Sequence, residues 1–320
     1  MIQDSQPSRI SVLLITFNHA AYIAKSVESI LSQNIDDKFD IIVADDGSTD
    51  DTVALLKEYA EQNEHIRFLF LDNSMNLGIT RNYLRAFRAC QSEYVAVMEG
   101  DDYWVSPDKL KKQRDFLDIH WECDLCSANY YVYEEDLCRF TLRVPIVEGY
   151  NIFGARELIA DNVVGNFSTC MYRLTALRRL PPKLFDIRSY DWAINICIGR
   201  EGLIAFLHEP MSVYRIHGRG AWSLLSQTAK LQAQLELIPA YDEVTDRVFH
   251  ADFSALAERL EGAVTGRQIS QLVTPVVVPI ARSFPQLIDL VPPVFVSLIK
   301  ALLPPVVKRY LIRLVMRGQA

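Results

Sequence analysis

Buried strands alternate with amphipathic helices over the first hundred residues, and this pattern constrains the fold more than any other sequence feature. Apolar, β-branched segments of this kind are typical of strands that are buried on both faces of a sheet. They lie at residues 10–16, 39–44, 66–71 and 94–98. Apolar residues recur at helical spacing between these segments, for example at Ile23, Val27 and Ile30. Such alternation over short connections predicts an α/β fold, with a mainly parallel sheet covered by helices.

Acidic or amide residues follow three of these strands at equivalent positions. Asp45 and Asp46 end the second strand, Asn76 follows the third, and Asp101 and Asp102 follow the fourth. Ligands of parallel α/β sheets bind at the carboxyl ends of the strands, so these clusters predict a binding site at one edge. Each cluster also has a simpler explanation, because Asp, Asn and Gly dominate ordinary turns.

The remainder of the chain divides into three stretches. From residue 123 to about 219 the pattern is mixed, with strands predicted over 125–133, 167–172 and 203–207 and helices over 155–159 and 191–198. The next stretch has helical spacing, whereas repeated prolines after Gly266 break the chain into short pieces. We therefore predict a first domain over residues 1–220, a helical segment packed on it over 221–266, and a Pro-broken, apolar and basic C-terminal extension over 267–320.

Charge and composition exclude some partners and suggest a compartment. A formal net charge of −7 over 320 residues argues against nucleic acid, whose phosphates are usually met by a basic surface. The polar N-terminus has no apolar stretch of signal-peptide length. No uninterrupted apolar run is long enough for a transmembrane helix, so a cytoplasmic location is expected. Cys123 and Cys126 form a C-x-x-C pair without the second pair that a structural zinc site needs, which favours ordinary reduced thiols.

Two of the acidic clusters suggest chemistry. The adjacent carboxylates of Asp101 and Asp102 repel each other unless a cation relieves them, and such oxygen ligands suit Mg²⁺ or Mn²⁺ bridging to a diphosphate. The alternative is a solvated turn. A carboxylate of Asp45 or Asp46 has the chemistry to bind a base or ribose, although no G-x-G-x-x-G or P-loop fingerprint is present. The alternative there is helix capping, as also expected of Asn18.

Six short motifs in this order resemble the family 2 glycosyltransferases. They span roughly residues 9 to 219 and read Thr16-Phe17-Asn18, Asp45-Asp46-Gly47-Ser48-Thr49-Asp50, Asn76-x-Gly78, Glu99-Gly100-Asp101-Asp102, Ser189-Tyr190-Asp191-Trp192 and Tyr214-Arg215-Ile216-His217-Gly218. Each motif alone is weak, but the set in this order and spacing is specific. The resemblance implies a GT-A fold, a nucleotide-sugar donor, a divalent metal ion (Mn²⁺ or Mg²⁺) and inversion at the anomeric carbon.

The resemblance also implies roles for individual residues. The catalytic base is Asp191, and the metal ligands are Asp102 and His217. Trp192 is expected either at the acceptor sugar or in the core. Donor binding is assigned to Thr16, Asn18, Asp45, Asp46, Asn76, Gly78, Asp101 and Arg215.

Two positions depart from the family pattern, and both lie beside these residues. Glu99 stands where Asp is common, which weakens a metal role at that position. Tyr190 precedes Asp191 where the family often has a Glu, which leaves the neighbour's role open but not the base itself. His217 has a second explanation as an ordinary loop histidine.

The resemblance favours a UDP-sugar donor and a glycan or lipid-linked acceptor in bacterial cell-surface polysaccharide assembly. The acid-free C-terminus carries Arg309, Arg313 and Arg317 beside apolar residues, so it is expected either to contact the inner face of a membrane or to pack on the first domain. Two other functions stay open. One is a nucleotidyltransferase, which needs a glycine-rich, basic loop that residues 10–22 lack. The other is a sugar- or nucleotide-binding module without catalysis, in which the acidic clusters are only turns.

Overall fold

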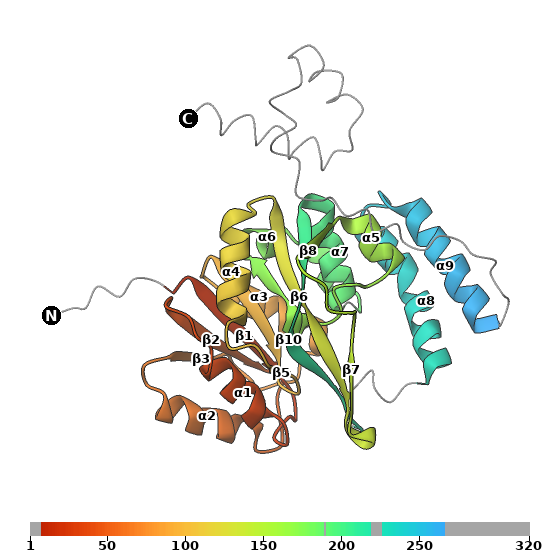
Figure 1. Cartoon of the computed structure of the whole chain (residues 1–320). Helices are drawn as coiled ribbons and strands as arrows, with labels where there is room; N and C mark the ends of the chain where they lie inside the picture. The colour runs from red at the N-terminus through yellow and green to blue at the C-terminus, as the bar shows by residue number, and fades with distance from the viewer. Residues whose placement is uncertain (1–7, 189, 219–225, 266–320) are drawn as a thin grey trace, which may run out of the picture.

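A ten-stranded sheet forms the centre of the computed structural model, which describes residues 8–188, 190–218 and 226–265 (Figure 1). The main path of the sheet runs β3-β2-β1-β4-β9-β6-β10-β5, with β7 paired to β6 and β8 paired to β10. The strands are β1 (Ile10–Thr16), β2 (Phe39–Asp45), β3 (Arg67–Phe70), β4 (Tyr94–Glu99), β5 (Tyr103–Trp104), β6 (Cys123–Glu134), β7 (Arg139–Leu142), β8 (Tyr150–Phe153), β9 (Met171–Arg173) and β10 (Leu203–Ile216).

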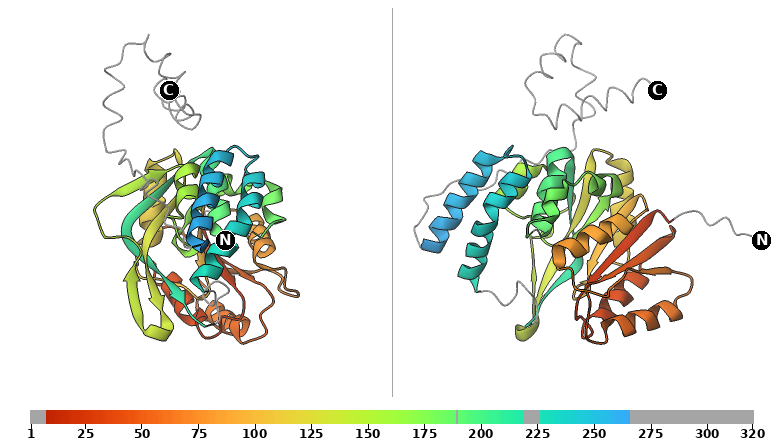
Figure 2. Two further views of the ribbon diagram at one scale, coloured as in Figure 1. Left: turned by 90° about the vertical axis from the view of Figure 1, so that its right-hand side faces the viewer. Right: turned by 180° about the vertical axis from the view of Figure 1, so that it is seen from behind.

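Helices cover both faces of this sheet. Among the described residues they are α1 (Ile23–Leu31), α2 (Thr52–Gln62), α3 (Ile79–Ala89), α4 (Lys109–Ile119), α5 (Ala155–Ala160), α6 (Leu174–Arg178), α7 (Asp191–Glu201), α8 (Gln227–Val244) and α9 (His250–Thr265). Successive side chains of a strand point to opposite faces, so Leu13 and Ile15 pack with α3, α6 and α7, whereas Val12 and Leu14 pack with α1, α2 and α4. The two layers are visible in Figures 1 and 2.

The predicted parallel arrangement is confirmed for β3, β2, β1 and β4, which run parallel to one another. The short strand β9 is antiparallel to both β4 and β6, whereas β6 and β10 are parallel to each other. β6, β7 and β10 extend beyond the helical layers toward the bottom of Figure 1. The fold is therefore the mixed, mainly parallel α/β sheet that the sequence predicts.

Two predicted strands differ from the structure. The predicted strand over 167–172 begins instead as a 3₁₀ turn at Phe167–Thr169, because the Thr169 hydroxyl donates to the Asn166 carbonyl at 2.7 Å and competes with strand pairing. β10 continues to Ile216, well past the predicted end at residue 207. Its register shifts around Pro210, where a bulge accommodates a proline that lacks a ladder donor.

The helices α8 and α9 pack on the α7 face through Ile238, Tyr241, Phe253 and Leu256, beside α5 and α7 in both figures. The predicted domain boundaries stay predictions. The C-terminal extension over 267–320 lies outside the described residues. Within the described part of the chain, no helix combines the length and hydropathy needed to cross a bilayer.

Candidate active site

The carboxyl ends of β2, β1 and β4 lie side by side, so the predicted polar clusters meet at one edge of the sheet. Thr16, the last residue of β1, is in register with Asp45 of β2, and Ile15 is in register with Glu99 of β4. The chain leaves β4 directly into the Gly100-Asp101-Asp102 turn. Parallel pairing therefore brings together residues that are far apart in the sequence.

The carboxylates of Asp45 and Asp46 organise the loops at this edge. Asp46 accepts backbone hydrogen bonds from Leu77 at 2.8 Å and Gly78 at 3.0 Å, so it fixes the loop after β3. Asp45 accepts from the Asn73 side chain at 3.1 Å and from the backbone of Ser48 at 2.8 Å. Both side chains are nearly inaccessible. Asn76 accepts from Gly78, whose φ of 80° favours glycine. Donor contact by these residues stays a prediction.

Asn18 holds the loop after β1 in place and does not cap α1, which is a correction of the sequence prediction. It has a left-handed φ of 55°, and its side-chain oxygen accepts from the backbone of Thr49 at 2.8 Å. The helix begins only at Ile23. The buried Thr16 hydroxyl lies 3.2 Å from Nδ1 of His19, so β1 and its loop present Thr16, Asn18 and His19 to one edge.

Asp101 faces two imidazoles. Its Oδ2 lies 3.1 Å from Nε2 of His217 and 3.7 Å from Nε2 of His19. Burial opposes ionisation of Asp101, but the hydrogen bond from His217 and the charge of His19 outweigh it and lower the pKa of the carboxyl. His217 is 3% exposed and packs on the Tyr22 ring with centroids 4.4 Å apart, so it is held beside Asp101, and its metal role stays a prediction.

Asp102 lies deeper, and both of its oxygens already accept hydrogen bonds from protein groups. The Ser168 hydroxyl donates at 2.6 Å and the Arg215 backbone at 2.9 Å, and the residue is 1% exposed. Burial, and then the charge of Asp101, raise its pKa well above the usual value. Burial likewise raises the pKa of Glu99, which accepts from the Tyr83 hydroxyl at 3.1 Å. Both oxygens of Asp102 are thus engaged by protein groups, whereas Asp101 faces two imidazoles, and the metal role of Asp102 stays a prediction.

The donor set at this edge fits a divalent cation that the substrate completes. The described residues contain no group of three or more His, Cys, Asp or Glu arranged to hold a metal ion. Asp101 and His217 nevertheless supply a carboxylate and an imidazole whose nearest atoms are 3.1 Å apart. Mg²⁺ in such sites commonly uses one or two carboxylates together with substrate phosphates and water. The pair therefore matches a site with few protein ligands.

Asp191 is the first residue of α7 and is only partly exposed. Burial raises its pKa to about 7, although the hydrogen bond from Asn162 at 3.4 Å and one from the Trp192 backbone act in the opposite direction. Its charge contributes to the raised pKa of Glu99, so Asp191 lies within electrostatic range of Glu99. The carboxyl groups of Glu99, Asp101, Asp102 and Asp191 are called the acidic chamber below. A carboxylate that titrates near neutral pH is suited to accept a proton from a hydroxyl.

Two predicted site residues are held by contacts within the protein. Trp192 is in the core, 8% exposed, where its indole donates to the Leu158 carbonyl at 2.6 Å, so it is not available to cover an acceptor sugar. Arg215 donates from Nε to the Asp101 backbone carbonyl at 2.9 Å, so it supports the turn that carries Asp101. Its predicted contact with the donor stays a prediction.

The sequence reasoning missed four residues of the site: Tyr83, Ser168, Tyr214 and His19. The ring of Tyr214 lies near the carboxylates, because the charges of Asp102, Glu99 and Asp101 contribute to its raised pKa after burial. No sequence signal marks Ser168 or Tyr83, since each comes from an element without a motif. His19 had a signal, because it directly follows the Thr16-Phe17-Asn18 motif.

A model of glycosyl transferase family 2 matches residues 11–180. This match covers β1 through α6 and includes the edge with Asp45, Asp46 and Asp101. The fold and the site together define a glycosyltransferase with a GT-A fold. The chain belongs to glycosyl transferase family 2.

Related proteins agree with this assignment. Residues of this chain are 32% identical over 213 positions to TuaG of Bacillus subtilis, provisionally named a teichuronic acid biosynthesis glycosyltransferase, covering 65% of this chain and 79% of TuaG. The S. aureus TarS 1–349 structure in complex with UDP-GlcNAc superposes with a TM-score of 0.57 at 18% identity, covering 81% of this chain and 72% of that one. The mannosyltransferase PcManGT of Pyrobaculum calidifontis, in complex with GDP-Man and Mn²⁺, gives 0.53 at 16% identity, covering 84% and 77%.

Proposed function

We propose that this glycosyltransferase transfers a sugar from a nucleoside diphosphate sugar to a hydroxyl group with inversion at the anomeric carbon. The observation that carries the proposal is the pairing of two functions in one acidic chamber. Asp101 and His217 lie at the carboxyl edge of the sheet, and Asp191 begins α7 with a pKa raised to about 7, within electrostatic range of Glu99.

The reaction needs little more than these groups. The acceptor oxygen attacks the anomeric carbon as the bond from that carbon to the diphosphate oxygen breaks, and the hydroxyl proton passes to the Asp191 carboxylate. Asp101 and His217 would hold Mn²⁺ or Mg²⁺, which supplies positive charge against the diphosphate. The carboxylates of Asp45 and Asp46 keep their loops in a fixed shape, so the donor meets a preorganised edge.

The donor is proposed to be a UDP-sugar, bound along Thr16, Asn18, Asp45, Asp46, Asn76 and Gly78. Support comes from the TarS complex with UDP-GlcNAc. PcManGT is in complex with GDP-Man, so the binding test below also includes sugars of other nucleotides. The name of TuaG supports a role in bacterial cell-surface polysaccharide assembly with a glycan or lipid-linked acceptor. Such a role fits a cytoplasmic enzyme that works at the inner face of a membrane.

Calorimetry with UDP-, dTDP- and GDP-sugars, with and without Mn²⁺, tests the donor site directly. Metal-dependent binding of one nucleotide class is the expected result. Absence of binding to every nucleotide by folded protein would overturn the proposal and favour a different role for the acidic edge. Asp101→Asn is expected to weaken the Mn²⁺ dependence, because it removes the accessible carboxylate charge.

Asp191→Asn separates binding from chemistry. The amide keeps the shape of the side chain but does not accept the proton, so donor affinity should be retained while turnover falls about 10²–10⁴-fold. Donor consumption measured by release of the nucleoside diphosphate reports the change. Full turnover in this variant would show that Asp191 is not the catalytic base. The proposed donor site would be unaffected by that result.

A further inference from the structure

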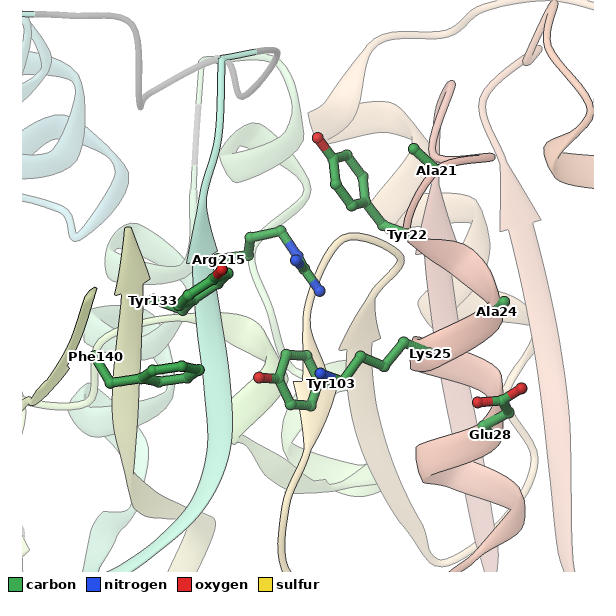
Figure 3. Close-up of a pocket in the computed structure, with 9 residues that line it drawn as sticks. All are labelled: Ala21, Tyr22, Ala24, Lys25, Glu28, Tyr103, Tyr133, Phe140 and Arg215. Carbon is green, nitrogen blue, oxygen red and sulfur yellow. The ribbon is translucent and has the colours of Figure 1, made fainter. Parts of the chain in front are cut away.

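A pocket of about 660 Å³ lies between α1 and the extended part of β6, β7 and β10, outside the acidic chamber (Figure 3). It is on the α1 side of the sheet, whereas Asp191 begins α7 on the opposite side. Volumes of this size are typical of small-molecule sites. The lining residues are Ala21, Tyr22, Ala24, Lys25, Glu28, Tyr103, Tyr133, Phe140 and Arg215.

Aromatic rings dominate the walls of this pocket. Tyr133 and Phe140 stack with centroids 4.4 Å apart and planes 26° apart, and Phe140 is 53% exposed although it is large and apolar. Tyr22 and Tyr103 stand on the α1 side of the cavity (Figure 3). Flat rings with polar tips suit a ligand that has both an apolar face and hydroxyl groups, and a pyranose ring has this character.

Positive charge accompanies the rings. The Lys25 ammonium lies 3.7 Å from the centroid of Tyr103, and within the described part of the chain it forms no ion pair with a carboxylate. The Arg215 guanidinium lies 4.9 Å from the Tyr22 ring, and its Nη1 is 3.5 Å from Glu135. Lys25 is thus a cation over an aromatic ring with its charge available to a bound anion.

We propose that this pocket is a second sugar site, which binds a glycan unit bearing a carboxylate or a phosphate. The ring of that unit stacks on Tyr133 and Phe140, and its negative group contacts Lys25. The proposal rests on the proposed function only in that a glycan is the substrate class. A glycan held here lies across the sheet from the base, so the pocket would retain the acceptor or product chain away from the point of transfer.

The pocket lies next to Asp101 and His217, but neither residue lines it. Arg215 lies in the pocket and donates to the Asp101 backbone, and Tyr22 contacts both Arg215 and the His217 ring. The side chains of Lys25 and Phe140 line the pocket below Tyr22 and Arg215, along α1 and β7 (Figure 3). A sugar in the pocket should therefore bind together with UDP rather than compete with it.

Saturation-transfer NMR on the full chain tests the site with methyl glucuronoside, glucose 6-phosphate and methyl glucoside as probes, in the presence of saturating UDP and Mn²⁺. The two anionic probes should bind, and the neutral probe more weakly. Binding of methyl glucuronoside would indicate a carboxylate ligand, and binding of glucose 6-phosphate a phosphate ligand. Lys25→Ala should weaken the anionic probes about tenfold, and Phe140→Ala should weaken all three.

Lys57→Ala is the control, because it removes the same charge from an exposed position on α2, outside the pocket. This variant should bind all three probes as the wild type does. No binding by any probe, or binding that survives both pocket variants, would overturn the second site. UDP binding by calorimetry is measured on the same samples, so loss of the donor site is recognised separately. Retained UDP binding in the pocket variants also shows that they are folded.

Discussion

At the scale of single residues, the acidic chamber depends on burial more than on residue type. Burial opposes ionisation of all four carboxyl groups, yet their hydrogen-bond and charge partners separate their pKa values. The pKa of Asp101 is lowered by His217, whereas the pKa values of Glu99, Asp102 and Asp191 are raised. Groups whose pKa values are pushed apart in one site can take different roles in acid–base chemistry.

The raised pKa of Asp191 predicts an acid limb in the rate profile. The base is effective only when ionised, and a pKa near 7 means that protonation removes it as the pH falls below about 7. We expect kcat to fall by about tenfold per pH unit below that point. Steady-state rates between pH 5 and 9 at saturating donor and metal measure it, and a rate that stays level down to pH 5 would contradict the assignment.

The buried Lys109 predicts a pH dependence of stability. Its Nζ donates to Gln113 at 2.6 Å and lies 4.4 Å from the Trp104 ring, and burial lowers its pKa to about 7. The unfolded chain binds the proton up to its ordinary pKa of 10.5, so the unfolding free energy should rise with pH between about 7 and 10, by up to roughly 1.4 kcal/mol per unit.

Denaturant unfolding at several pH values measures this slope. Lys109→Met should flatten it, because no side chain then changes its charge on unfolding at that position. Lys57→Met on the exposed side of α2 is the matched control and should leave the slope as it is. An equal slope in the wild type and in Lys109→Met would show that Lys109 does not cause the pH dependence of the unfolding free energy.

At the scale of elements, the turn between β4 and β5 fixes the geometry of the site. A Cβ at Gly100 would lie 2.8 Å from both Thr16 Oγ1 and His19 Nδ1, closer than real side chains approach. The requirement here is close packing between two loops, since the backbone of Gly100 does not need a left-handed conformation.

Gly100→Ala should therefore displace Thr16 or His19 and disturb Asp101. We expect a loss of about 1–3 kcal/mol in stability and weaker Mn²⁺ binding in the presence of UDP. Calorimetry and thermal unfolding report the two effects. Gly218→Ala is the matched control, since a Cβ there meets no atom of the described residues within 4 Å. Identical behaviour of the two variants would argue against a packing role for Gly100.

At the scale of the whole molecule, one sheet joins two hydrophobic clusters. Trp104 belongs to the cluster on the α1 face and Trp192 to the cluster on the α7 face. Every residue of β1 is buried because the strand contributes to both. The two layers depend on the same strands, so they should unfold together.

Proteins that retain only Trp104 or only Trp192 test this cooperativity. In each of them, the fluorescence midpoint in denaturant should coincide with the midpoint from far-UV circular dichroism. Separate midpoints for the two faces would show that the layers unfold independently.

The sequence alone determined the local elements and the class. Strands such as Ile10–Thr16 were predicted because an apolar, β-branched run has few other stable environments. The order of short motifs was enough to predict the family. The strand over 167–172 was predicted wrongly in its first half, since a hydroxyl that bonds locally leaves the apolar pattern unchanged.

Only the tertiary structure decided which side chains do what at the edge. Asp101 and Asp102 are adjacent and chemically equal in the sequence, but one faces imidazoles and the other is enclosed by Ser168 and the backbone of β10. Trp192 packs in the core while its neighbour Asp191 stays partly exposed, because consecutive residues at the start of a helix point in different directions. Burial and partners come from contacts between distant segments, and a linear pattern does not contain them.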